Sequence, residues 1–294
     1  MSIRDRVRAG AHGGAADGVR PLGRSDQADF LGLTGRAPVV NVFAEYRARM
    51  TMLEPRWLGG QVWGLHEDQR LVAGCHLGAN LVPVGCDEET VLAFARVALS
   101  RTRETATIVG PHAAVAALWQ EVGHRWGSPP REVRWQQPHL EIDTPPLVEP
   151  DPAVRRARPD DVERLYPACV AMYTEEVGVS PEAGGGREHY LARVRQLVAK
   201  GWSFARFDED GEVVFKAEVA CATPYAAQVQ GVWVRPDHRG RDLAKHGMAA
   251  VVTEVQRDIA PVVSLYVNEW NEAARGAYER VGLRETARFS TIMF

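Results

Sequence analysis

The chain has 294 residues, 45% hydrophobic and 25% charged, a composition typical of globular proteins and long enough for two domains. The formal net charge of −3 argues against a nucleic-acid partner, because binding the phosphate backbone needs a concentrated basic face. No apolar run approaches the roughly 18 residues of a membrane span, so we expect a cytoplasmic protein with no membrane partner.

The first half predicts a complete set of strands and helices. Residues 1–18 are charged and rich in glycine and alanine, so we expect a flexible N-terminal tail. Residues 19–142 then contain a hairpin pattern over 60–74, a strand ending near Pro83, a buried strand at 107–110 and a helix from His112. The turn after Pro83 holds Asp87-Glu88-Glu89, which suits the start of a helix and repels phosphate.

The second half repeats this plan after a break. Residues 143–153 are rich in proline and acidic residues, which exclude a helix or central strand and predict a linker. Residues 154–294 again contain a hairpin pattern, over 201–217, followed by strand, helix, strand, helix and a final strand over 284–294. The repeated order predicts two copies of one α/β unit.

A turn in the second copy has the features of an anion site. Pro236 has no N–H to give to a ladder, so the strand before it must end there. An amphipathic helix follows, and its first N–H groups lack intrahelical partners at the positive end of the helix dipole. Arg239 and Arg241 add positive charge, and Gly240 permits a positive φ.

These residues resemble the GNAT superfamily of acyl-CoA-dependent N-acetyltransferases. The family's phosphate cradle, Arg/Gln-x-x-Gly-x-Gly/Ala after a Val-x-Pro strand end, matches Val234-Arg235-Pro236 and Arg239 to Ala244. Its second motif matches the run from Asn271 through Tyr278 to Gly282. The resemblance covers 154–294 and implies an α/β (α+β) fold of two tandem GNAT-like domains, each a mixed central sheet flanked by helices. Residues 19–142 are then a degenerate first copy, as in tandem actinobacterial GNAT proteins.

The resemblance implies acetyl-CoA as co-substrate and assigns residues to it. The expected cofactor-binding residues are Val232, Trp233, Val234, Arg239, Gly240, Arg241, Asp242, Leu243, Ala244 and Asn271. Asp242 departs from the family, which has glycine there; a carboxylate near a diphosphate is unfavourable unless it turns outward to pair with an arginine. Asn271 could equally act only as a helix cap.

Three acidic residues and one tyrosine are the candidates for catalysis and acceptor binding. By its place in the second motif, Tyr278 would protonate the departing thiolate; alternatively it only packs the helix on the sheet. Where the family often has a glutamate base, this chain has Gln228 and Gln230, so the base is assigned to Glu218, with a salt bridge to Lys216 as the alternative. A cationic acceptor would bind Glu175 and Glu176, which could instead form a solvated helix end.

The leading hypothesis is an N-acetyltransferase that moves an acetyl or related acyl group to a primary amine by direct attack in a ternary complex. The acceptor is expected to be a small-molecule or peptide amine, and a homodimer is left open. No metal is expected, because the four cysteines are widely spaced and no histidine lies at ligand spacing. The alternatives are a catalytically weakened CoA-binding or scaffold protein and an aminoacyl-tRNA-dependent transferase.

Overall fold

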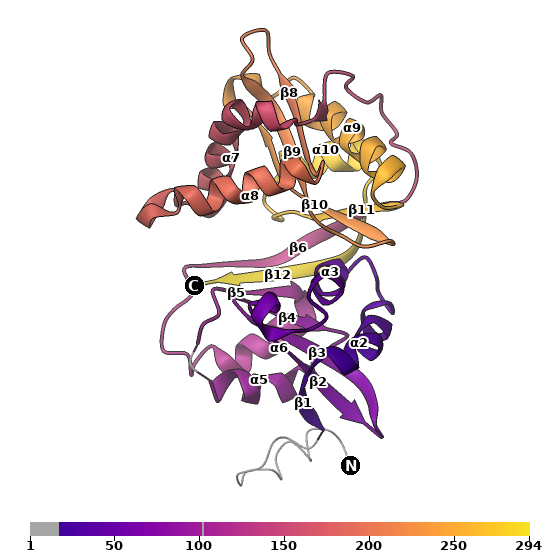
Figure 1. Ribbon diagram of the computed structural model, residues 1–294, viewed down its shortest axis with the longest axis vertical. Helices are drawn as coiled ribbons and strands as arrows, with labels where there is room; N and C mark the ends of the chain where they lie inside the picture. Colours follow the sequence, from indigo (N-terminus) through magenta and orange to yellow (C-terminus); the bar gives the residue numbers. More distant parts are fainter. Residues whose placement is uncertain (1–17, 102) are drawn as a thin grey trace. The chain divides into compact units, whose positions relative to one another are not determined.

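A computed structural model describes residues 18–101 and 103–294, so the predicted tail falls almost entirely outside the described residues. The chain forms two compact units. Unit 1 contains residues up to His139 together with Glu285–Phe294, and unit 2 contains Leu140–Arg284. Each unit has a mixed sheet with helices against it, which confirms the predicted fold class (Figure 1). Among the described helices, none combines the length and apolarity needed to span a bilayer.

Unit 1 is built around a sheet with the strand order β1-β2-β3-β4-β5-β12-β6. The strands from β1 to β4 pair antiparallel, as do β5 and β12, whereas β4 and β5 run parallel. Helices α2 and α3 pack against a core that includes Phe30 and Leu33, while α5 and α6 pack against a second core around Phe94. Its elements are β1 (Val19–Leu22), α2 (Gln27–Thr34), α3 (Val42–Thr51), α4 (Pro55–Leu58), β2 (Gly60–Glu67), β3 (Arg70–Gly78), β4 (Asn80–Val84), α5 (Val91–Leu99), β5 (Thr107–Pro111), α6 (His112–Val122), β6 (Glu132–Ile142) and β12 (Arg284–Met293).

Unit 2 has the strand order β7-β8-β9-β10-β11, antiparallel except for the parallel pair β10 and β11. Helices α9 and α10 pack on one face of this sheet, and α7 and α8 on the other (Figure 1). Its elements are β7 (Arg155–Arg156), α7 (Val162–Val177), α8 (Arg187–Ala199), β8 (Ser203–Phe207), β9 (Val213–Ala222), β10 (Ala226–Val234), α9 (Leu243–Asp258), β11 (Val262–Tyr266) and α10 (Glu272–Val281), with short 3₁₀ turns at Pro159–Asp161, Ala183–Gly185 and Pro236–His238.

The expected domain boundaries at 19–142 and 154–294 do not coincide with these units. The last strand, β12, pairs with β5 from Phe289↔Pro111 to Met293↔Thr107, so 285–294 belong to unit 1. A strand pattern shows that a strand forms but not which sheet edge it joins. The 143–153 segment has neither helix nor strand, yet it is not a free linker: Leu147 N donates to Val281 O and Asp151 N to His246 O, both within unit 2.

Candidate acyl-CoA site

The expected cofactor strand separates from its parallel neighbour. β10 pairs with β11 only from Ala226↔Val262 to Gln228↔Ser264. Beyond that point β10 continues to Val234 and still pairs with β9, whereas its other edge has left β11. The predicted residues Val232, Trp233 and Val234 therefore lie on a strand edge that could hydrogen-bond an extended ligand as an added strand.

The turn after β10 leaves a set of backbone donors without acceptors. Gly240 has φ +74°, as predicted, and no heavy atom lies within 4 Å of where its Cβ would be. The first bond of α9 runs from His246 N to Asp242 O. In the described part of the chain, no residue accepts a hydrogen bond from the amides of residues 240–245. These donors, which include the predicted Leu243 and Ala244, lie at the positive end of a sixteen-residue helix.

Asp242 does not close this anion position. Its backbone is left-handed, with φ +60°, where a glycine would adopt the same shape without strain. The carboxylate is 58% exposed and lies 3.0 Å from Lys245 Nζ. The hydrogen bond from Lys245 lowers the pKa of Asp242 below its ordinary value, and charges including that of Arg280 add to the effect. The side chain turns outward as one alternative required, but it pairs with a lysine rather than an arginine.

The corresponding helix in unit 1 shows the opposite arrangement. The Asp87 carboxylate, just before α5, accepts hydrogen bonds from Glu89 N at 3.1 Å and Thr90 N at 2.8 Å. These bonds, with one from the Thr90 hydroxyl, lower the pKa of Asp87. The chain's own carboxylate thus occupies the place where a bound phosphate would accept the same hydrogen bonds.

A predicted acceptor-binding residue, Glu175, is in contact with a predicted cofactor-binding residue, Arg239. The Glu175 carboxylate, near the end of α7, accepts from Arg239 Nη2 at 2.6 Å and from Trp233 Nε1 at 2.9 Å. Arg239 also donates through Nε to Val234 O. The candidate acceptor-binding residue is therefore already paired with a cofactor-binding arginine, while Arg241 is exposed in the turn.

The second motif lies on α10. Asn271 Oδ1 accepts from Ala274 N at 3.1 Å, so this side chain caps the helix, as one reading of the sequence proposed. Tyr278 is 6% exposed and packs in the core between α10 and the sheet. Its hydroxyl forms no hydrogen bond in the described part of the chain, and burial, with a contribution from Glu176, raises its pKa well above the ordinary value. The hydroxyl is thus kept protonated.

Glu218 forms the salt bridge that was the alternative to a catalytic base. Lys216 Nζ lies 3.1 Å from its Oε2, and Gln230 Nε2 donates to its Oε1 at 2.8 Å. Burial acts to raise the pKa of Glu218, but Lys216 and Gln230 outweigh it and hold that pKa below its ordinary value. A carboxylate stabilised in its charged form is a poor proton acceptor, so the structure gives it little strength as a base.

Sequence reasoning missed Arg280, whose charge acts on Asp242 from the last turn of α10. The sequence could have indicated this residue, because Arg280 lies two residues after Tyr278 in the second motif.

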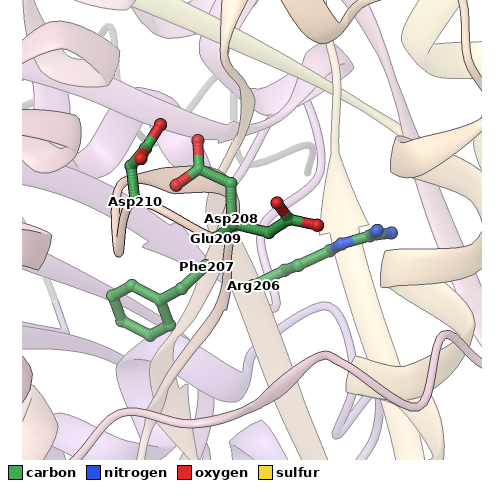
Figure 2. Close-up of a pocket in the computed structure, with 5 residues that line it drawn as sticks. All are labelled: Arg206, Phe207, Asp208, Glu209 and Asp210. Atoms are coloured by element: carbon green, nitrogen blue, oxygen red, sulfur yellow. The ribbon is translucent and has the colours of Figure 1, made fainter.

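A shallow pocket at the β8–β9 turn, lined by Arg206 to Asp210, contains none of the predicted site residues (Figure 2). Within the described residues, no three His, Cys, Asp or Glu side chains are grouped to hold a metal ion.

Comparison with known proteins agrees with this geometry. Residues 187–283, which include the divergent strands, the turn and α10, match the Acetyltransferase (GNAT) family. Unit 2 contains a GNAT acetyltransferase domain. Residues 60–165, mostly in unit 1, match a domain of unknown function, DUF4081. No curated protein matches the sequence.

Solved structures extend the likeness to almost the whole chain. A GNAT-family acetyltransferase from Colwellia psychrerythraea has a TM-score of 0.56 at 14% identity, covering 94% of this chain and 99% of its own. A Drosophila protein scores 0.66 at 16% identity, with 95% and 99% covered. A tandem GNAT protein from the clavulanic acid biosynthesis pathway scores 0.57 at 16% identity, with 93% and 97% covered. At these identities the likeness establishes the fold of the GNAT domain and of the N-terminal region before it.

Proposed function

We propose that this protein is an acyltransferase that moves the acetyl group, or a related acyl group, of acyl-CoA to a primary amine. The observation that carries the proposal is the set of unaccepted amides at residues 240–245 beside the open edge of β10. Backbone donors at a helix start suit a diphosphate, and an open strand edge suits the amides of a pantetheine arm. The equivalent helix start in the first copy, at α5, does not offer this, because the Asp87 carboxylate accepts its hydrogen bonds.

The residues present fit acyl-CoA. The amides of residues 240–245, with Arg239, Arg241 and Lys245, would bind the diphosphate, and Val232 to Val234 would bind the arm. The bound thioester supplies the activated acyl group. A backbone N–H of Val232 or Val234 would polarise its carbonyl, as oxyanion donors do in other acyl transfers.

Transfer would proceed by direct attack of a neutral amine on the thioester carbonyl. The carbon–sulfur bond breaks as the carbon–nitrogen bond forms, the sulfur takes up a proton and leaves as the thiol of CoA, and the nitrogen gives up one proton to solvent. We propose Tyr278 as the source of the proton that the sulfur takes up, because a tyrosine hydroxyl is protonated at neutral pH and this one donates to no other group in the described chain. We propose a small-molecule or peptide amine as acceptor, held near Glu175 and Glu176 at the end of α7.

One observation favours a second function, that of a CoA-binding protein without turnover. Glu218 is committed to Lys216, which leaves the general base unassigned. Both functions require CoA binding, and only the first requires thiol release.

Isothermal titration with CoA and acetyl-CoA, followed by thiol release from acetyl-CoA with a panel of primary amines, separates the two functions. We expect saturable binding and amine-dependent release. Binding without release by any amine would favour the second function. No binding of either compound would refute both.

A further inference from the structure

The strand that would polarise the thioester contains a bulge at a defined place. Gln230 pairs with Glu218 and Trp233 pairs with Lys216, so Gly231 and Val232 together oppose only Ala217. One extra residue on β10 bends that strand locally. Gly231 adopts φ +60°, which a glycine tolerates.

The two residues of β9 that flank this bulge form an ion pair with each other. Lys216 is completely buried and Glu218 is 5% exposed. Lys216 Nζ donates to Glu218 Oε2, and Gln230, the last residue before the bulge, donates to Glu218 Oε1. The pair therefore spans the interval of β9 over which β10 gains its extra residue, and Gln230 ties it across to β10.

The ion pair also lies directly beneath the bulge. A Cβ placed on Gly231 would be 3.0 Å from Lys216 Nζ and 3.4 Å from Glu218 Cδ, with Met172 of α7 also at 3.0 Å. Any larger residue at this point would have to displace the ammonium group or the methionine. The bulge backbone and the charged pair thus fit against each other closely.

Stability alone is a weak reason for charges in this position. The alternate residues of β9, which are Phe215, Ala217 and Val219, face the apolar core under α9 and need no polar partner. A buried ion pair can often be replaced by apolar side chains of similar volume without loss of stability. Its presence against the bulge, and its hydrogen bond to Gln230, suggest a task tied to the shape of β10.

We infer that the Lys216–Glu218 pair is a positioning device that fixes the bulge at Gly231 and so sets the direction of the Val232 backbone amide. This inference rests on the proposed function, in which that amide polarises the thioester carbonyl. The pair acts through the backbone of β10 and does not touch the substrate. Glu218 thereby has a role in the reaction other than that of a base.

The test replaces both charges at once. The double variant Lys216→Met with Glu218→Met keeps the side-chain volume and leaves no unpaired buried charge, so the fold should persist. Lys216→Met alone would leave the buried carboxylate of Glu218 without its partner. We expect the dissociation constant for CoA to change by a smaller factor than kcat, because the turn at residues 240–245 is untouched and only the contacts of Val232 to Val234 with the pantetheine arm are disturbed. The kcat for thiol release from acetyl-CoA, with water as acceptor, should fall by about tenfold or more, since one misdirected oxyanion donor has effects of this size or larger.

A second measurement does not depend on activity. Hydrogen exchange in the segment 226–234 should be about tenfold faster in the double variant, with unchanged exchange in α9. The matched control is Arg206→Met, which breaks the Arg206–Asp151 ion pair of the neighbouring strand β8 and should alter neither readout.

Unchanged exchange in 226–234, or an unchanged kcat in a folded double variant, would overturn the inference. A failure of the proposed function looks different: the unsubstituted protein itself would bind CoA without releasing thiol, while exchange would still report whether the pair holds the bulge.

Discussion

Replacing Asp242 by glycine should tighten CoA binding, and the size of the effect follows from the geometry of the turn. The substitution removes a negative charge that lies at the start of α9, and it leaves Lys245 without its present partner at 3.0 Å. It also lets the left-handed backbone at this position relax, because glycine has no Cβ.

The size of the expected change in CoA affinity follows from the interaction between exposed charges, those of Asp242 and of the diphosphate. One exposed charge pair changes an affinity by a factor of about 1.5 to 5. The diphosphate carries two charges, so we expect the dissociation constant for CoA to fall by a factor between about 2 and 25 at 50 mM salt. The screening length shrinks from about 14 Å at 50 mM to about 4 Å at 500 mM salt, so the gain should be smaller there.

Isothermal titration at both salt concentrations measures this effect, and Asp242→Asn is the matched control. Asparagine removes the charge but keeps the side chain and tolerates left-handed backbone, so it should reproduce most of the gain. Weaker binding in Asp242→Gly would refute our account of the turn. A gain that is confined to glycine and insensitive to salt would assign the effect to the backbone instead.

Three further predictions follow from the contacts described above. Tyr278→Phe should lower kcat for thiol release by about a hundredfold with an unchanged dissociation constant for CoA, and equal activity would remove this residue from proton transfer. Glu175→Gln should tighten CoA about twofold to fivefold by releasing Arg239, and the gain should vanish in an Arg239→Gln background; a gain that persists there would be simple charge repulsion. Burial lowers the pKa of His76 and of His139 to about 4 each, from an ordinary 6.5. As the pH falls below 6.5, the two histidines become protonated in the unfolded chain but stay neutral in the folded unit 1 until about pH 4. The free energy of unfolding of unit 1 should therefore fall by about 2 kcal/mol per histidine between pH 7 and 5. Urea unfolding followed by hydrogen exchange in unit 1 measures this, His76→Gln should remove about half of the loss, and a pH-independent midpoint would contradict the assignment.

Features that depend on neighbouring residues were predictable from the sequence. Pro236 predicts the end of the strand because it lacks a donor, and Gly240 has the positive φ expected of it. The repeated order of strands and helices predicts the two similar units. An isolated Gly231 within a strand is itself a signal of a bulge, although only the register locates it opposite Ala217.

Features that depend on distant residues were not predictable. Glu175 and Arg239 are 64 positions apart, and no local pattern indicates that they meet. The competing roles of Glu218 could be stated but not separated, since the choice depends on whether Lys216 lies within bonding distance. The last strand has the same pattern whichever edge it joins, so its place beside β5 appears only in the fold.

The position of β12 has a consequence for how the protein is made. Because this strand lies between β5 and β6, the sheet of unit 1 stays incomplete until residues 285–294 have left the ribosome. The nascent chain must therefore keep an unpaired β5 edge in solution while the whole of residues 140–284 is synthesised. That interval exposes the protein to aggregation and gives chaperones a reason to bind it.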